Sequence, residues 1–391
     1  MEWTYDFNPP GKIVFGWGRR EEVGRLAGEL GNRAFLVCGS RTLEASGEID
    51  KLTKSLEQAG VGVRRLFEIR HEPQVEDVDR CTERLRAQEA GQGDLLLAIG
   101  GGSAIDLAKA AAAMITNRQS TTVADYLEGV GRGLKLLAPP LPLLAIPTTG
   151  GTGSEATKNA VISSYDPPFK KSLRHDRMVP RAVLVDPELS VGVSPTTTAW
   201  TGMDAITQLI ESYVSRFARP LPRSLALGAM RPALTALPEA VRDGSSRPAR
   251  EAMAHAALVS GMALAHSGLG LAHGVAAALG VHGKVPHGLA CAVMLPVALR
   301  VNRPVCEKEL AELARGALAG NWQTAAAAAD AFLRAIDELA AAVGVPKRLC
   351  ELGIRREQLP DLVVSSRGNS MNGNPVQLTD GELGRLLEEV L

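Results

Sequence analysis

The sequence predicts an α/β amino-terminal domain built on a parallel sheet and an all-α carboxyl-terminal domain. Up to about residue 187, short continuous apolar runs alternate with stretches of helical spacing, whereas from Pro195 onward almost no strand pattern occurs. Continuous apolar runs are typical of strands buried on both faces, and their alternation with helices indicates βαβ units. We therefore assign residues 1–187 to the α/β domain and residues 188–391 to the helical domain.

The apolar runs give the expected strands in chain order: 33–38, 94–99, 141–146 and 182–185. A short opening strand, IVFG, precedes them, and helical stretches at 20–29 and 76–90 lie between them. Helical spacing in Ala- and Leu-rich sequence predicts the later helices at 197–218, 224–241, 247–266, 306–343 and 380–390. The polar, turn-rich segment 365–379 receives no assigned role.

Length, charge and cysteine content exclude several classes of protein. The 391 residues indicate two domains at about 100–200 residues each. Lys plus Arg and Asp plus Glu each number 43, so no net basic charge exists to gather nucleic acid or an anionic membrane surface. No signal peptide or membrane helix is expected. The five cysteines form no CxxC pair, which argues against disulfides or a zinc–thiolate site and favours free thiols in a reducing cytoplasm.

The first glycine loop, Ile99-Gly-Gly-Gly-Ser103, separates a strand from the start of a helix. Glycines let backbone N–H groups approach a bulky anion, and a helix start offers free donors, so this loop is suited to a pyrophosphate. It lacks the GxGxxG spacing of the usual dinucleotide fingerprint. A tight strand–helix turn explains the loop equally well.

A second loop, PTTGGTGSE at 147–155, also follows a buried strand. Ligands bind at the carboxyl ends of the strands in open α/β sheets, and two such loops lie at that edge. The pair of loops therefore predicts nucleotide binding.

The helical half carries a candidate metal set. Asp204 and Gln208 lie four residues apart and share one helical face, and His273 and His287 suit a helix and the loop after it. A carboxylate and two imidazoles can hold a divalent cation, whereas an amide is a poor ligand. By spacing alone, core histidines are the commoner explanation.

Together these segments resemble the iron-containing (group III) alcohol dehydrogenases, within the dehydroquinate-synthase-like fold. The resemblance covers essentially the whole chain. The segments occur in family order: KIVFGWGRREEV at 12–23, GGGSAIDLAK, PTTGGTGSE, VDPEL at 185–189, GMDAITQLIE and the HG…PHG segment.

The resemblance implies a nucleotide-binding α/β domain, a helical metal-holding domain and a site in the cleft between them. The cofactor residues that it implies contact the pyrophosphate, the cofactor cleft or the ribose: Gly101, Gly102, Ser103, Thr148, Thr149, Thr152 and Lys170. We add Asp106, on the helix after the first loop, to this set. Asp204, His273 and His287 match three of the four family metal ligands, which hold Fe²⁺ or Zn²⁺.

Two departures from the family pattern concern the chemistry. Gln208 stands where the family carries its fourth ligand, a histidine, and Ala277 stands where a second histidine faces the nicotinamide. His282 or the cofactor ribose hydroxyl is the available substitute in the proton relay, although His282 is also explained as a loop-lining residue. Ala277 predicts a roomier pocket and a bulkier substrate.

Ser40 and Arg41 bear on the choice of cofactor. NAD-preferring relatives often carry an Asp after the first strand, where this chain has Ser40 followed by Arg41. A small polar residue and a guanidinium suit a 2′-phosphate, which favours NADP(H) over NAD(H). A solvent-facing Arg41 is the ordinary alternative.

We expect reversible hydride transfer between the nicotinamide and an alcohol or aldehyde. A bound metal acts as the Lewis acid; without it, protonated His273 or His287 is the candidate electrophile. The alternatives are a metal-independent keto-acid or carbonyl reductase similar to maleylacetate reductases, and an inactive NADP-binding module. By resemblance, the edge of the opening strand pairs with a second subunit, which predicts a homodimer.

Overall fold

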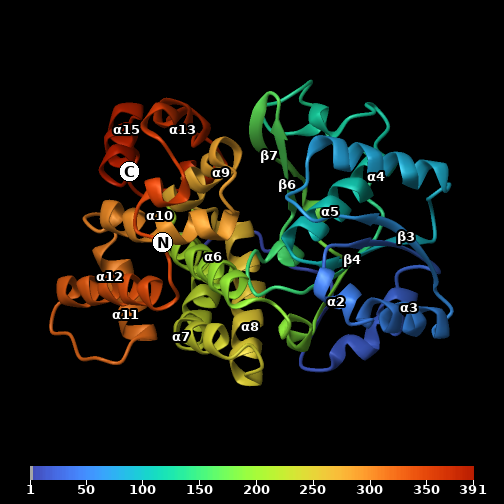
Figure 1. The fold of residues 1–391 in the computed structure, drawn as a ribbon, viewed down its shortest axis with the longest axis horizontal. Helices are drawn as coiled ribbons and strands as arrows, with labels where there is room; N and C mark the ends of the chain where they lie inside the picture. Colours follow the sequence, from blue (N-terminus) through green and yellow to red (C-terminus); the bar gives the residue numbers. More distant parts are fainter. Residues whose placement is uncertain (1–2) are drawn as a thin grey trace. The chain divides into compact units, whose positions relative to one another are not determined.

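The computed structural model describes residues 3–391, which divide into two compact units. We call residues 8–149 and 153–193 the sheet unit, and residues 3–7, 150–152 and 194–391 the helical unit. Figure 1 shows the strands in the first and most of the helices in the second. The long continuous segment of the helical unit starts at Ser194, whereas the predicted second domain started at residue 188. The short helix η5 (Pro187–Ser190) belongs to the sheet unit because Leu189 is buried in its core.

The predicted parallel sheet is present and has six strands, all pairing in parallel. Their spatial order is β1 (Ile13–Phe15), β8 (Ala182–Val185), β5 (Leu143–Pro147), β4 (Asp94–Gly100), β2 (Arg33–Cys38) and β3 (Gly62–Glu68). The four predicted apolar runs became β2, β4, β5 and β8. Their carboxyl ends lie at one edge of the sheet, where the two glycine loops begin.

Both faces of the sheet are buried, as the continuous apolar runs predicted. Along β2, Phe35 and Val37 belong to one hydrophobic core and Leu36 and Cys38 to the other, because side chains alternate between faces. The helices of this unit are α1 (Val23–Gly28), α2 (Arg41–Ala45), α3 (Glu48–Gln58), α4 (Val75–Ala87) and α5 (Gly102–Thr116). Helices α4 and α5 cover the first core and α1 to α3 cover the second, as Figure 1 shows.

Three strands have no strong apolar run in the sequence. The edge strand β3 is largely polar and exposed, and the sequence analysis did not identify it. It also missed the antiparallel hairpin of β6 (Asn159–Tyr165) and β7 (Pro168–Arg174), which packs on the core beside α5. Edge strands and hairpins bury one face at most, so they carry alternating rather than continuous apolar sequence.

The helical unit is built around one large core. Its helices are α6 (Pro195–Val214), α7 (Pro220–Arg242), α8 (Arg247–Ser267), α9 (Leu271–Gly283), α10 (His287–Asn302), α11 (Glu307–Ala317), α12 (Ala325–Ala342), α13 (Leu359–Ser365), α14 (Asn369–Asn372) and α15 (Asp380–Glu389). The predicted helix at 306–343 is two helices, α11 and α12. Gly320 lies in the break between them, where helix propensity is lowest.

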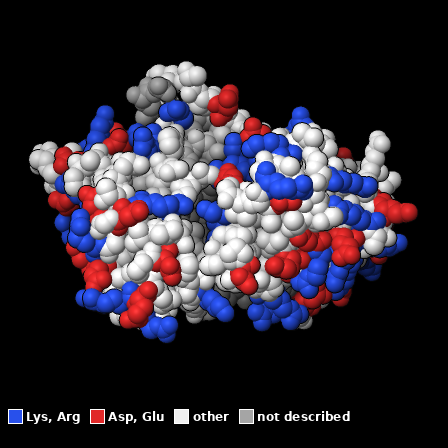
Figure 2. Space-filling view, turned by 90° about the horizontal axis from the view of Figure 1, so that it is seen from above, with Lys and Arg blue, Asp and Glu red and all other residues white. Residues whose placement is uncertain are grey.

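Within residues 3–391, no single helix is long and apolar enough to span a membrane, and only the bent pair α8 and α9, taken together, reaches that length and apolarity. On the face drawn in Figure 2, basic and acidic side chains are interspersed.

Candidate functional site

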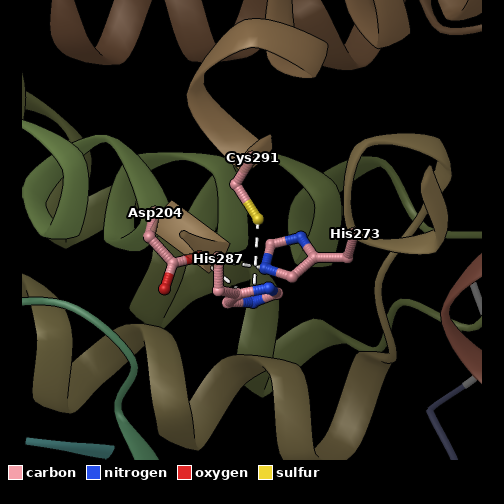
Figure 3. A group of neighbouring side chains, drawn as sticks. All are labelled: Asp204, His273, His287 and Cys291. Atoms are coloured by element: carbon pink, nitrogen blue, oxygen red, sulfur yellow. Dashed lines mark hydrogen bonds and ion pairs between the residues drawn. The ribbon is translucent and has the colours of Figure 1, made fainter. Parts of the chain in front are cut away.

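Four buried or half-buried side chains from three helices of the helical unit point toward one another. Asp204 comes from α6, His273 from α9, and His287 and Cys291 from α10. One ligand atom from each lies within 4.8 Å of all the others. Figure 3 shows the two imidazoles, the carboxylate and the thiol converging on one point. A carboxylate, two imidazoles and a thiol are the donors that tetrahedral divalent metals take in proteins, so this set fits such an ion.

Helix α6 supplies the polar face on which this group is built. Its first turn is stabilised by an N-cap, because the Ser194 hydroxyl accepts a hydrogen bond from Thr197 N at 3.2 Å, and by Pro195 as its first residue. Asp204, Gln208 and Glu211 follow at spacings of four and three residues and therefore share one face. All three are buried.

Glu211 orients the His273 imidazole, and the sequence analysis missed it. Its Oε2 lies 2.7 Å from His273 Nδ1, and Asp204 Oδ1 lies 3.1 Å from Nε2, so each ring nitrogen of His273 faces a carboxylate. The same carboxylate accepts Gly270 N at 3.0 Å and Ala272 N at 2.7 Å, at the start of α9. Glu211 could have been found from its spacing, because it lies two helical turns after Asp204 and therefore shares the same face of α6.

The electrostatics of the group favour a positive charge at its centre. Burial opposes ionisation of Asp204, but His273 and His287 outweigh it and hold its pKa below the usual value. Burial also disfavours the imidazolium of His273, yet the Asp204 and Glu211 carboxylates beside it raise its pKa well above the usual value. Burial raises the pKa of the Cys291 thiol to about 12. A bound cation would compete with these protons for the same atoms.

Gln208 and His282 form hydrogen bonds with other side chains. Gln208 Oε1 accepts a hydrogen bond from the Ser260 hydroxyl of α8 at 2.6 Å. His282 lies nine residues after His273 on α9, about 14 Å along the helix axis, and its Nε2 contacts Ser365 Oγ at 2.7 Å. His287 was expected on a loop but is the first residue of α10.

The segment 365–379, which had no predicted role, supports the start of α9. Asn374 is fully buried, and its Oδ1 accepts Leu271 N at 3.0 Å. Asn374 and Asn302 exchange hydrogen bonds through their amides at 2.8 and 2.9 Å. This segment therefore helps to fix the helix that carries His273.

The first glycine loop of the sheet unit is tightly packed and ends at a helix start. A Cβ on Gly100 would lie 2.8 Å from Ala104 Cβ and 3.0 Å from Gly39, so larger residues do not fit where β2, β4 and α5 meet. Gly101 is the residue before α5, and Gly102 and Ser103 are its first two residues. Their amides lie where a helix has no internal acceptors and where an anion is favoured.

The second loop lies beside the first. Thr148 N donates to Gly100 O at 3.0 Å, and a Cβ on Gly101 would lie 3.3 Å from Thr149 Oγ1. Thr152 belongs to the helical unit, since residues 150–152 pack there. Asp106 is buried beneath the loops, where its Oδ2 accepts Val161 N at 2.9 Å and its Oδ1 accepts the Ser154 hydroxyl.

The other predicted cofactor residues lie elsewhere in the sheet unit. Ser40 is the N-cap of α2, and its Oγ accepts Leu43 N at 3.4 Å. Arg41 is exposed. Lys170, on β7, forms an ion pair with Glu72 Oε2 at 2.6 Å.

Comparison with known proteins gives a consistent result over the whole chain. The family description "Iron-containing alcohol dehydrogenase" matches residues 10–187, and "Fe-containing alcohol dehydrogenase family, C-terminal" matches residues 198–391. The chain is 34% identical to long-chain-alcohol dehydrogenase 1 of Geobacillus thermodenitrificans, covering 96% of each chain.

Two further relatives differ in the cofactor that their names give. NAD-dependent methanol dehydrogenase of Bacillus methanolicus is 31% identical, over 99% of this chain and 100% of that one. NADPH-dependent butanol dehydrogenase of Clostridium saccharobutylicum is 32% identical, over 98% of this chain and 97% of that one. A crystal structure of a 1,3-propanediol oxidoreductase superposes with a TM-score of 0.91 at 29% identity, covering 99% of this chain and 100% of that one.

Proposed function

The chain belongs to the iron-containing alcohol dehydrogenase family of NAD(P)-dependent enzymes, and we propose that it interconverts alcohols and aldehydes at a divalent metal ion held by Asp204, His273 and His287. The observation that carries the proposal is the convergence of three donor atoms: His273 Nε2 lies 3.1 Å and His287 Nε2 4.0 Å from Asp204 Oδ1. Fe²⁺ and Zn²⁺ both accept such donors.

The residues of the chain have separate tasks in this reaction. When bound, the metal supplies a Lewis acid for the substrate oxygen, and the nicotinamide accepts or donates the hydride. Asp204 and the imidazoles would hold the cation, and Glu211, which faces Nδ1, would keep the remaining ring proton of His273 there when Nε2 binds the cation. His287 has 27% of its side chain exposed, against 4% or less for Asp204 and His273, and so lies on the solvent side of the group.

In the sheet unit, we assign cofactor binding to the two adjoining loops. The amides of Gly102 and Ser103 at the start of α5 suit the pyrophosphate, and Thr148 and Thr149 flank them. Asp106 supports the loops from beneath, through Ser154 and Val161.

The test begins with metal per chain. Elemental analysis of protein purified without chelator or added metal should find about one divalent ion per chain. NAD(P)⁺ reduction with a series of primary alcohols should be lost on chelation and restored by Zn²⁺ or Fe²⁺. Activity that persists with no metal bound would overturn the metal proposal and favour a metal-independent carbonyl reductase.

We propose NADP(H) as the preferred cofactor. Ser40 brings no carboxylate to the position where NAD-preferring relatives often carry Asp, and Arg41 is exposed beside it. Ser40→Asp should shift the ratio of kcat/KM from NADP⁺ toward NAD⁺, because an added carboxylate repels the 2′-phosphate. Ser40→Asn, which adds similar volume without charge, is the matched control. An unchanged ratio in the Asp variant would contradict the assignment.

Ala277 bears on the substrate. It lies one turn after His273 on α9, where the family pattern has a histidine, and its small side chain leaves room for a bulky or branched substrate. Ala277→His should therefore lower turnover of bulky aldehydes more than that of short ones. A wild-type preference for the shortest aldehydes would contradict this proposal.

We also propose a homodimer formed through β1. This strand is at the edge of the sheet and pairs with β8 on its inner side, so its other side offers backbone groups to a second strand. Light scattering during size-exclusion chromatography should give twice the 41.3 kDa chain mass. A mass of one chain would contradict the proposal.

A further inference from the structure

The side chain of Cys291 lies inside the group of metal-binding candidates. It is fully buried, one turn after His287 on α10, so the two side chains share a helical face. Its Sγ lies 3.7 Å from His287 Nε2. In Figure 3 the sulfur points toward the space between the two imidazoles and the Asp204 carboxylate.

Gln208, at the position of the family's fourth ligand, contacts a hydroxyl of the neighbouring helix α8 through its side-chain oxygen. Its carbonyl oxygen, the only atom through which an amide binds a hard cation, lies 2.6 Å from Ser260 Oγ, whose single hydrogen is shared between this oxygen and Ala257 O at 2.8 Å. The amide is also neutral, whereas a thiolate carries a full charge and is a preferred ligand of zinc.

The separations of the donor atoms match one coordination shell. Metal bonds of 2.0–2.3 Å in a tetrahedron place neighbouring ligand atoms about 3.3–3.8 Å apart. In the structure the separations are 3.1 Å for His273 Nε2 to Asp204 Oδ1, 3.7 Å for Cys291 Sγ to His287 Nε2, and 4.0 Å for His287 Nε2 to Asp204 Oδ1. Every pair among the four residues lies within 4.8 Å, so all four are close enough to share one ion.

We propose that Cys291 is the fourth metal ligand, replacing the imidazole that is missing at Gln208, and that its sulfur shifts the site toward Zn²⁺. This inference rests on the metal site proposed above. On binding, the S–H bond breaks, the sulfur lone pair forms the metal–sulfur bond, and the proton passes to solvent. The thiolate and Asp204 together neutralise the charge of the ion. The odd number of cysteines and the absence of CxxC pairs had argued against a zinc–thiolate site.

The metal-substituted protein gives a readout independent of activity. Apoprotein loaded with one equivalent of Co²⁺ should show a near-ultraviolet sulfur-to-cobalt charge-transfer band, and Cys291→Ser should lose it. Cys306→Ser should keep the band, because Cys306 is buried in the same unit but lies outside the group. Gln208→Ala should also keep it.

Zinc X-ray absorption of the wild-type protein covers the case in which Cys291→Ser fails to fold. It should find one sulfur at about 2.3 Å together with nitrogen and oxygen neighbours. In competition between Zn²⁺ and Fe²⁺ without oxygen, Cys291→Ser should lower the bound zinc-to-iron ratio by about tenfold or more, since thiolate ligands favour zinc.

The outcomes separate this inference from the proposed function. Stoichiometric metal with no sulfur signal, or a charge-transfer band that survives in Cys291→Ser, would overturn the role of Cys291 and leave the metal-dependent reaction standing. Loss of bound metal in Gln208→Ala with full retention in Cys291→Ser would assign the fourth position to the amide. No metal bound under any condition would overturn both proposals.

Discussion

Each unit of the molecule buries a cluster of charged side chains, but the two clusters differ in the source of their positive charge. In the sheet unit, the cation is the ammonium of Lys109, which donates to Ser154 O at 2.7 Å and to Thr157 Oγ1 at 2.8 Å. Its Nζ also lies 3.4 Å from Asp106 Oδ1. The carboxylate and the ammonium thus compensate each other within the chain.

In the helical unit, Asp204 and Glu211 contact imidazoles rather than a lysine or arginine. Glu211 Oε2 accepts a hydrogen bond from His273 Nδ1, and the side chains of the four-residue group converge on one point. A buried carboxylate beside a lysine is compensated within the chain, whereas buried carboxylates with converging imidazoles and a thiol have the donor atoms that fit a metal ion. This difference separates a structural charge cluster from a binding site.

The largest expected effect comes from removing a metal ligand. His273→Ala should lower metal content and reduce kcat/KM by about a thousandfold, because a Lewis acid contributes several kcal/mol and about 1.4 kcal/mol is tenfold in rate. Elemental analysis and steady-state kinetics measure both quantities. His282→Ala, on the same helix, should retain its metal. Unchanged metal content in His273→Ala would contradict the distinction between the clusters.

The corresponding change in the sheet unit should affect stability instead. Lys109→Met leaves Asp106 buried without its cation and should lower the free energy of unfolding by about 3–5 kcal/mol. Urea unfolding measures this loss, and metal content should match the wild-type value. If the free energy of unfolding fell by less than about 1 kcal/mol, the ion pair would not be the source of compensation.

Glu155, beside Lys109, gives a pH test of the same cluster. Burial raises its pKa from 4.5 to about 7. The folded protein therefore holds this proton more tightly than the unfolded chain, so the contribution to stability is full below about pH 4.5 and is lost as pH rises toward about 7, a change of about 3 kcal/mol. Glu155→Gln should flatten the decline in unfolding free energy over that range. Parallel pH curves for the two proteins would refute this prediction.

The smallest expected effect concerns the residue that orients a ligand. Glu211→Gln keeps an oxygen for the α9 amides but replaces the acceptor for His273 Nδ1–H. Metal affinity should fall by about 10–100-fold, as for other residues that support metal ligands. Competition with a chelator measures this affinity. Glu239→Gln is the control: it removes a surface ion pair with Arg242 on α7 and should leave the metal affinity unchanged. A similar loss in both variants would argue for a general effect on folding.

Most of the fold could be predicted because buried strands carry their own signal. Runs such as 33–38 and 182–185 are apolar throughout, since both faces of the sheet are covered, and their predicted bounds match the structure. Strand β3 was not predicted, because Arg64 and Arg65 interrupt its apolar sequence at a sheet edge where these side chains are exposed. Its position depends on pairing with β2, which local sequence does not specify.

The candidate site was predictable in part. The resemblance supplied Asp204, His273 and His287, and the structure brings these three together. Cys291 was missed because His287 was expected on a loop, which hid the four-residue helical spacing between them. Asn374 received no role, because its partner Leu271 is far away in the sequence.

The contact between Asn374 and the start of α9 has a consequence for biosynthesis. Leu271 N finds its acceptor only when a residue more than one hundred positions later in the chain has folded against it. During translation, the helix that carries His273 therefore lacks this support until the ribosome has added Asn374. We expect ion uptake to be a late event: nascent chains stalled before Asn374 should retain less zinc on the ribosome than released chains.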